Sequence, residues 1–239
     1  MLKLNKMLYI VATPIGNLKD ITFRAVEVLK NSEIILCEDT RVSKKLLNYY
    51  QIKKPLLSYH QHSSPKKVEK IISLLKEGKT ISLICDAGTP SIADPAGKLI
   101  EEIIKKAPQI EIKPIPGPSA LTTALSAAGL PANQFVFLGF LPKRKKRKVI
   151  LEKILTKEEK TIVFYESPFR IIKTLSEMEK IDKESNLNHQ TIVFKELTKK
   201  FEKTWRGNSI KEVLEKINKE NKIKGEFVIV LKKRNGKEK

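Results

Sequence analysis

Short apolar runs alternate with amphipathic stretches along almost the whole chain, and this alternation restricts the fold more than any other feature. The runs are rich in Ile, Val, Leu and Phe, which is typical of buried strands. In the stretch over residues 65–78, Val68, Ile71, Ile72 and Leu75 share one helical face. Strands are expected at residues 7–12, 33–37, 80–85, 110–115, 135–138, 161–165, 191–195 and 227–231. The pattern predicts an α/β fold with mostly parallel sheets and about five strands in each half.

Residues that cap helices indicate where the helical stretches begin. Asp20 or Thr22 precedes a helix ending near residue 31, and Thr40 precedes one at residues 42–49. Ser167 and Pro168 open the helix that follows residues 161–165. Gly78 predicts the end of the helix at residues 65–78.

The alternation is interrupted once, by the block IPGPSA at residues 115–120. Two prolines and a glycine suit neither a strand nor a helix interior. We therefore expect two α/β domains, at residues 1–115 and 119–239. A length of 239 residues is comfortable for two domains.

The chain is strongly basic, with 47 Lys and Arg against 27 Asp and Glu and a net charge of +20. Such an excess favours a polyanionic partner, although solvated helix faces would also account for it.

Cys37 and Cys85 lie in apolar runs without CxxC spacing or a histidine partner, which predicts free thiols rather than a disulfide or zinc site. No apolar stretch reaches the roughly 18 residues that span a bilayer, so a soluble cytoplasmic protein is expected.

Four loops that follow predicted strands are unusually rich in proline and glycine. They are ATPIGNLKD (12–20), DAGTPSIADPAG (86–97), PIPGPSA (114–120) and YESPFR (165–170). Ligands of doubly wound α/β domains bind beyond the carboxyl ends of strands, so these loops predict a ligand site. Neither GxGxxG nor GxxxxGK[ST] occurs, and proline-rich loops lack amide donors for phosphate. The ligand is therefore expected to be uncharged or zwitterionic.

Two aspartates in the loop at residues 86–97 could cap a helix instead of binding a ligand. Asp86 serves either a ligand or the cap of the helix beyond the loop. Asp94 directly precedes Pro95, which favours helix capping.

The residues of these loops, with several other segments, resemble the tetrapyrrole (corrin/porphyrin) methylase superfamily, and within it the branch that modifies ribosomal RNA. The segments that carry the resemblance are LYIVATPIGNLKDIT (8–22), CEDTR (37–41), SYHQHS (58–63), DAGTPSIADPAG (86–97), PIPGPSALTTALSAAGLP (114–131), GFLPKRKKRK (139–148), FYESPFRI (164–171), KELTKKFE (195–202) and KGEFVIVL (224–231). Tetrapyrrole branches usually have a GDP-type loop where this chain has AGTP. Longer members of the RNA branch continue past the last strand into a helical extension, whereas this chain ends in KKRNGKEK.

The resemblance implies a methyltransferase with S-adenosylmethionine held in a cleft between the two domains. It implies methylation of the ribose 2′-oxygen of a cytidine in the decoding region of small-subunit ribosomal RNA, on the 30S subunit, by a homodimer. The residues that it places at the cofactor are Ile15, Gly16, Asp86, Ala87, Gly88, Thr89, Pro90, Ile92, Ser119, Ala120, Tyr165, Gly225, Glu226 and Phe227.

Methyl transfer requires alignment and removal of a proton from a weakly acidic hydroxyl. Candidates for positioning or proton removal are Glu166, Arg170, Asp39, Arg41 and His60, with Glu38, His62 and Glu196 beside them; no metal is expected. Glu166 and Arg170 stand four residues apart where a helix begins, so they also suit a mutual ion pair.

The six consecutive cations Lys143, Arg144, Lys145, Lys146, Arg147 and Lys148 are expected to bind RNA phosphates. Two other functions fit parts of the pattern. A corrin or porphyrin methylase would share the cofactor loops, and a non-catalytic RNA-binding assembly factor would share the basic surface.

Overall fold

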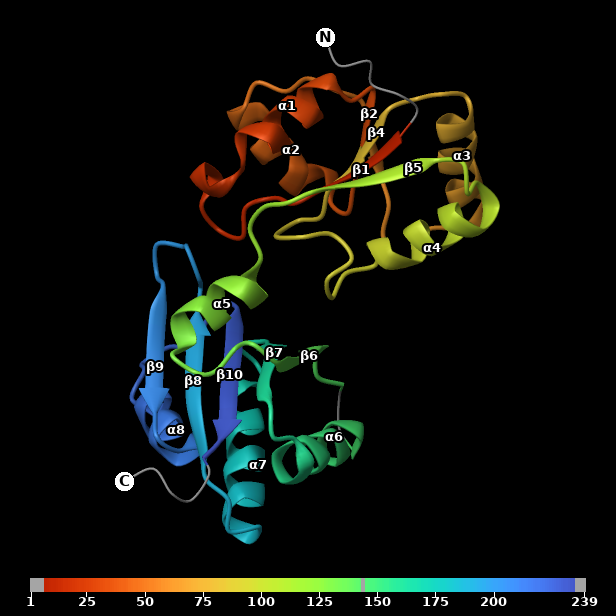
Figure 1. Cartoon of the computed structure of the whole chain (residues 1–239). Coiled ribbons are helices and arrows are strands. Elements are labelled where there is room, and N and C mark those ends of the chain that lie inside the picture. The colour runs from red at the N-terminus through yellow and green to blue at the C-terminus, as the bar shows by residue number, and fades with distance from the viewer. Residues whose placement is uncertain (1–6, 143–144, 235–239) are drawn as a thin grey trace. The chain divides into compact units, whose positions relative to one another are not determined.

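The structure is a computed structural model that describes residues 7–142 and 145–234. It forms two compact units, and the division falls between Ser119 and Ala120. Each unit contains one five-stranded sheet with helices packed on both faces (Figure 1).

The elements of the first unit alternate between strand and helix. They are β1 (Met7–Val11), the 3-10 helix η1 (Leu18–Asp20), α1 (Phe23–Asn31), β2 (Ile34–Cys37), α2 (Thr40–Tyr49), β3 (Leu56–Ser58), α3 (Pro65–Lys76), β4 (Ile81–Leu83), α4 (Ala96–Lys106) and β5 (Glu111–Ile115). The sheet order is β3-β2-β4-β1-β5, and every pairing is parallel. A helix separates each strand from the next, which gives the chain the length to return and run parallel.

Side chains of β1 alternate between the two faces of this sheet. Leu8 and Ile10 join the core under α3 and α4, with Ile71, Leu75, Leu99 and Ile103. Met7, Tyr9 and Val11 join the core under α1 and α2, with Ala25, Leu29 and Leu47. The strand is therefore buried on both sides, as its continuous apolar sequence predicts.

The second unit begins with a helix. Its elements are α5 (Ala120–Ala128), β6 (Phe135–Phe140), α6 (Lys145–Lys157), β7 (Thr161–Glu166), α7 (Ile171–Glu184), β8 (His189–Lys195), β9 (Lys203–Gly207), α8 (Ile210–Asn218) and β10 (Phe227–Lys233). Along β10, Phe227, Ile229 and Leu231 face the core that includes α7 and α8 residues. Val228 and Val230 face the core formed with α5.

The second sheet is mixed, with the order β6-β7-β10-β8-β9. Only β6 and β7 pair in parallel; the other three pairings are antiparallel. β7 and β8, which α7 joins, still run in the same direction. They are not neighbours in the sheet, because β10 lies between them and is antiparallel to both. The chain reverses directly only between β8 and β9, where residues 196–202 contain no helix. The expectation of parallel sheets thus describes the first unit fully and the second in part.

Several local features differ from the sequence expectation. The edge strands β3 and β9 are too short or too polar to form a recognisable apolar run. Helix α2 is capped by Asp39, whose carboxylate accepts the Arg41 amide, so the expected Thr40 cap is wrong. Thr22 caps α1, accepting the Ala25 amide at 3.1 Å. Helix α7 begins only at Ile171, after the Ser167-Pro168 turn.

Two further sequence expectations can be compared with the structure. Cys37 and Cys85 are free and buried, as expected. Within residues 7–142 and 145–234, no helix is long and apolar enough to cross a membrane.

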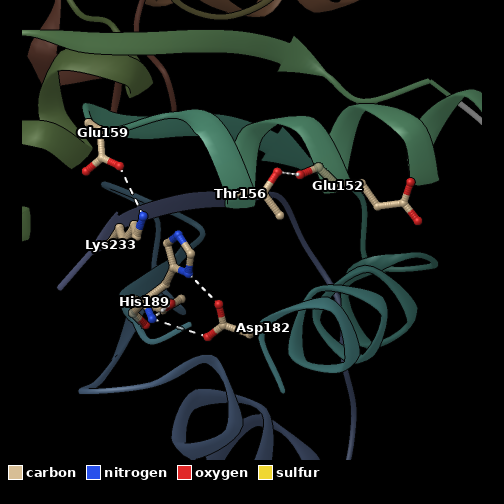
Figure 2. A network of polar contacts seen from close by, with 7 residues as sticks. Glu152, Thr156, Glu159, Asp182, His189 and Lys233 are labelled. Carbon is tan, nitrogen blue, oxygen red and sulfur yellow. Dashed lines mark hydrogen bonds and ion pairs between the residues drawn. The ribbon is translucent and has the colours of Figure 1, made fainter. Parts of the chain in front are cut away.

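A buried polar pair joins α7 to the start of β8 in the second unit. The Asp182 carboxylate accepts the His189 backbone amide at 3.2 Å and contacts ring Nδ1 at 2.5 Å (Figure 2). The His189 side chain is fully buried. Buried donors that lose their acceptor destabilise the folded state, so Asp182 fixes the end of α7 against the sheet.

We expect Asp182→Ala to lower the free energy of unfolding by about 1–3 kcal/mol for each buried donor left without an acceptor. Urea denaturation measures this. Asp182→Asn keeps one amide oxygen as acceptor and should lose less. Equal stability of Asp182→Ala and the wild type would contradict this role.

Candidate functional site

In the first unit, three of the four proline- and glycine-rich loops are joined by hydrogen bonds from main-chain groups and threonine hydroxyls. Thr13, after β1, donates its amide to the Gly88 carbonyl at 2.8 Å and accepts the Gly88 amide at 3.0 Å. Thr13 Oγ1 also donates to the Cys85 carbonyl at 3.1 Å. Thr89 Oγ1 donates to the Pro118 carbonyl at 3.1 Å. The loops after β1, β4 and β5 therefore form one connected surface at the carboxyl ends of parallel strands, where ligands of this fold class bind.

Two glycines allow this close approach. Gly88 has φ +83°, a conformation that L-residues rarely adopt, and Ile15 and Pro118 already lie close to where its Cβ would stand. A Cβ at Gly117 would lie 3.0 Å from that of Ala12.

The remainder of the 86–97 loop is held in an unusual backbone conformation. Ser91 and Ala93 have φ of 74° and 60° without being glycine, which costs of order 1–3 kcal/mol each. Asp94 Oδ1 accepts the Ser91 amide at 2.9 Å and the Ala96 amide at 2.7 Å, so it binds the first amide of α4. The N-cap position itself is Pro95, one residue later than predicted. Asp94 Oδ2 and Ser91 Oγ are buried without a partner among the described residues. Strain and orphaned polar atoms in one loop are typical of a ligand site.

Carboxylates from the ends of β2 and β4 gather beside this loop. Asp86 Oδ1 accepts the Asp39 amide at 3.1 Å and so links the two strand ends. Asp86 does not cap α4, because the amide at the start of that helix goes to Asp94. Glu38 lies next to Asp39, half-buried.

The three carboxyl groups differ in acidity. Burial raises the pKa of Glu38, and the charges of Asp86 and Asp94 raise it further. The pKa of Asp86 is also raised, chiefly by burial. Hydrogen bonds from the Arg41 side chain and amide lower the pKa of Asp39 to about 2. Of these groups Asp39 is the weakest proton acceptor, while Glu38 and Asp86 hold a proton more readily than ordinary carboxyls.

His60 lies at the end of β3, beyond Glu38. Its backbone amide donates to Ser63 Oγ at 3.0 Å, and its Nδ1 accepts the His62 amide at 3.2 Å. Burial raises the pKa of Glu38, and the nearby His60 acts in the opposite direction with a smaller effect. The first unit thus brings Asp39, Arg41 and His60 to one edge of its sheet.

Glu166 and Arg170 form their own network in the second unit. The Glu166 side chain is fully buried; Oε1 accepts the Ser167 amide at 2.7 Å and Arg170 Nε at 2.8 Å. Oε2 accepts Thr174 Oγ1 at 2.7 Å, and Arg170 Nη1 donates to the Leu141 carbonyl. Both carboxylate oxygens are therefore occupied, and the pair holds together the chain after β6 and the turn after β7. This geometry gives Glu166 a structural role and leaves no free oxygen pointing to a ligand.

A second constrained loop follows β8. Glu196 and Thr198 have φ of 52° and 66°. Lys199 Nζ bridges Glu196 Oε1 at 2.9 Å and Glu226 Oε2 at 2.8 Å. Gly225 has φ +96°, and a Cβ there would overlap the Glu196 side chain. The loop at residues 196–202 and the residues before β10 thus form one rigid assembly.

The residues predicted to bind the cofactor fall in both units. Ile15, Gly88 and Pro90 are buried, whereas Gly16, Asp86, Ala87 and Ile92 are exposed and Thr89 is half-buried. Ser119 and Ala120 flank the division between the units. Tyr165, Gly225, Glu226 and Phe227 belong to the second unit, where Phe227 is buried in the core and packs near Trp205. Their role at the cofactor stays a prediction.

The structure divides the basic run expected to bind RNA. Lys143 and Arg144, with the Lys145 side chain, lie outside the described residues. Lys146 and Lys148 are exposed on α6. Arg147 is only 4% exposed, and its guanidinium donates to Glu177 on α7 at 2.7 and 2.9 Å. Arg147 therefore anchors α6 to α7, which corrects its assignment to RNA.

Two site residues were missed by sequence reasoning. The only sequence signal for Thr13 is its position between a buried strand and Pro14. The only signal for Lys199 is that it stands three residues after Glu196 in the segment KELTKKFE. Both act through partners far along the chain, which no local pattern reveals.

Known proteins match this chain along nearly its whole length. Residues 7–212 match the family described as Tetrapyrrole (Corrin/Porphyrin) Methylases. The chain is 45% identical to a protein named ribosomal RNA small subunit methyltransferase I from Hydrogenobaculum sp., over 95% of this chain and 96% of that protein. It is 44% identical to a protein of the same name from Bacillus subtilis, over 97% of this chain and 77% of that protein.

A solved structure shares the fold at low sequence identity. The uroporphyrin-III C-methyl transferase from Thermus thermophilus, complexed with S-adenyl homocysteine, aligns with a TM-score of 0.60 and 16% identity. The alignment covers 94% of this chain and 96% of that one.

We expect Asp86→Asn to lower the pKa of Glu38 toward its ordinary value, because one of the negative charges that raise it is removed. Burial remains, so the pKa should stay above that of a free glutamate. Carbon-13 NMR titration of the glutamate carboxyl resonances measures the shift. An unchanged Glu38 titration would show that the two carboxyls do not interact.

Proposed function

The chain belongs to the ribosomal RNA small subunit methyltransferase I family of the tetrapyrrole (corrin/porphyrin) methylases, and on this premise we propose that it methylates small-subunit ribosomal RNA with S-adenosylmethionine. The observation that carries the proposal is 45% identity extending over almost all of both chains. We further propose that the acceptor is the ribose 2′-oxygen of a cytidine in the decoding region. This finer assignment rests on the resemblance of segments such as CEDTR and AGTP.

The loops of the first unit suit S-adenosylmethionine, which carries a zwitterionic amino-acid part and a cationic sulfonium. Main-chain groups around Gly88 approach closely because residue 88 has no Cβ, and the buried Asp94 Oδ2 and Ser91 Oγ lack partners. These polar atoms, with the exposed Asp86 carboxylate, would bind the hydroxyl and amino groups of S-adenosylmethionine. When bound, the cofactor supplies a methyl carbon already activated by the adjacent sulfonium.

The chain itself has to remove the proton from the accepting hydroxyl. Asp39 is poorly suited to accept this proton, because Arg41 binds its carboxylate and lowers its pKa to about 2. Glu38 has a raised pKa and no hydrogen-bond partner among the described residues. A base with a pKa nearer to neutrality transfers protons more effectively. We therefore assign proton removal to Glu38. Burial, and then the charge of Asp86, keeps the pKa of Glu38 raised.

The exposed lysines of α6 would attract the RNA backbone. Lys146 and Lys148 remain free to face solvent, although Lys148 lies 3.6 Å from Glu152. Phosphate contacts position the RNA without reading its sequence.

Methyl transfer to 30S subunits is the direct test. We expect label from S-adenosylmethionine to appear in the ribosomal RNA of subunits from cells that lack the enzyme. A ribose-methylated cytidine in the nuclease digest would support the finer assignment. Label in a porphyrin precursor and none in RNA would contradict the proposal.

A thermal shift with the cofactor separates an enzyme from a binding factor. Ligand at about 100 times its dissociation constant stabilises a protein by roughly 2.7 kcal/mol. An absent shift at saturating S-adenosylmethionine would favour a non-catalytic RNA-binding protein.

We expect Glu38→Gln to lower kcat by about 10²–10⁴-fold, the range for losing a general base. The affinity for S-adenosylmethionine, measured by calorimetry, should change little, because Gln keeps the size of the side chain. Glu27→Gln, on the exposed face of α1, is the matched control. Wild-type kcat in Glu38→Gln would remove Glu38 from the mechanism.

A further inference from the structure

Three strands of the second sheet end at the same edge. β6 and β7 are parallel, and β8 runs in their direction because both β7 and β8 are antiparallel to β10. The carboxyl ends of β6, β7 and β8 therefore lie along one side of the sheet, together with the amino ends of β9 and β10.

An exposed phenylalanine stands at or just after each of these three strand ends. Phe140, the last residue of β6, is 57% exposed; Phe169, after β7, is 95% exposed; and Phe201, after β8, is 69% exposed. Single exposed apolar side chains are ordinary on a protein surface, but three phenylalanines at one sheet edge form a repeated feature. The functions proposed above for the basic run on α6 and for the loops of the first unit do not explain why these three phenylalanines are exposed.

The segments beneath these rings are rigid. Phe140 packs edge-on against Tyr165 with ring centroids 5.4 Å apart. The turn with Phe169 is held by Glu166 and Arg170. The loop with Phe201 is braced by Lys199, and Thr198 donates its amide to Glu202 at 2.7 Å. The rings are thus presented on fixed backbone rather than on flexible loops, which lowers the entropy cost of binding.

Lysines surround the third phenylalanine. Lys195, Lys222 and Lys224, with Phe201, Gly225 and Glu196, line a hollow of about 320 Å³. Glu196 is the one acidic residue of this lining, and its carboxylate is paired with Lys199. Lys200 Nζ lies 5.7 Å from the Phe201 ring centroid. None of Lys195, Lys200, Lys222 and Lys224 has a carboxylate within ion-pair distance in the part of the chain that the structure describes. We call Phe140, Phe169, Phe201 and these four lysines the aromatic edge.

We propose that the aromatic edge binds single-stranded RNA, whose bases stack on the phenylalanine rings while the lysines contact the phosphates. The inference rests on the proposed function, since it names a second surface for the same RNA. Exposed flat rings together with unpaired cations are the combination by which proteins hold unpaired nucleotides. The hollow beside Phe201 favours RNA over a membrane surface, because a concave site of this size accommodates a base and its sugar.

Equilibrium binding of the full chain to a fluorescein-labelled single-stranded RNA of about 12 nucleotides, a length within known single-strand site sizes, tests this directly. We expect Phe201→Ala to weaken binding by about 5- to 150-fold, the range for losing one stacked base. Phe201→Tyr keeps a flat ring and should bind like the wild type, whereas Phe201→Leu should behave like Ala. Phe23→Ala removes an even more exposed ring, 99% against 69% for Phe201, from the first unit and should have no effect.

The lysines are tested by salt dependence. The double variant Lys222→Gln, Lys224→Gln should flatten the slope of log affinity against log salt by about 1.4, or roughly 0.7 for each lost phosphate contact. The control pair Lys180→Gln, Lys183→Gln, near the other end of α7, removes the same charge and should leave the slope unchanged. Unaltered melting temperatures verify that the variants fold.

Each contrary outcome is specific. Wild-type RNA affinity in Phe201→Ala, or equal effects of Phe201→Ala and Phe23→Ala, would overturn the stacking surface while the proposed methyltransferase stands. Loss of binding to phosphatidylserine vesicles with unchanged RNA binding would identify the edge as a membrane surface and overturn it too. If the wild-type chain neither bound nor methylated RNA, the proposed function itself would fall.

Discussion

The reciprocal pairing of Thr13 with Gly88 controls the geometry of the first unit's site. It consists of two main-chain hydrogen bonds and depends on a φ of +83° that glycine alone adopts without strain. Through Thr89 the same loop is tied to Pro118, and through Asp86 to the end of β2. The ends of four neighbouring strands are therefore positioned by main-chain bonds together with the Thr89 and Asp86 side chains. The Glu38 carboxyl is consequently not consumed in holding loops, and it remains open to chemistry.

The second unit achieves the same rigidity with charged side chains. Glu166 and Lys199 each bind several partners, and these contacts hold the turns after β7 and β8. Because these polar groups are fully occupied, what remains at that edge for a ligand is the row of exposed phenylalanines and unpaired lysines. Buried polar groups thus support the loops, and exposed groups are left for binding.

Electrostatics differs sharply between the local site and the whole protein. A net charge of +20 produces a long-range field that attracts a polyanion. The ends of β2 and β4 nevertheless concentrate Glu38, Asp39 and Asp86. Burial, with a smaller contribution from neighbouring aspartates, raises the pKa of Glu38 and of Asp86. A phosphate backbone drawn to the basic surfaces would avoid this acidic spot, which is compatible with the proposed role of Glu38 as a base.

The sequence by itself determined the elements whose signals are local. Continuous apolar runs identified the buried strands, and the i, i+4 spacing of Glu166 and Arg170 correctly suggested their ion pair. The helix expected over residues 65–78 ends at Lys76, and Gly78 follows its C-cap with φ +94°, so the predicted stop signal is present two residues beyond the last helical residue. The short edge strands β3 and β9 carried no such signal, because an edge strand needs no apolar run. The direction of β8 and β10 could not be read either, since a strand's sequence does not record which neighbour it pairs with.

Only tertiary structure decided the roles of residues that look alike along the chain. Arg147 and Lys148 are adjacent cations, yet Arg147 is buried against Glu177, thirty residues away, while Lys148 faces solvent. Thr13 acquires its role from Gly88, seventy-five residues away. Local propensity depends on neighbours in sequence, whereas burial, pKa and hydrogen-bond partners depend on neighbours in space, and those are set only when the strands assemble into sheets.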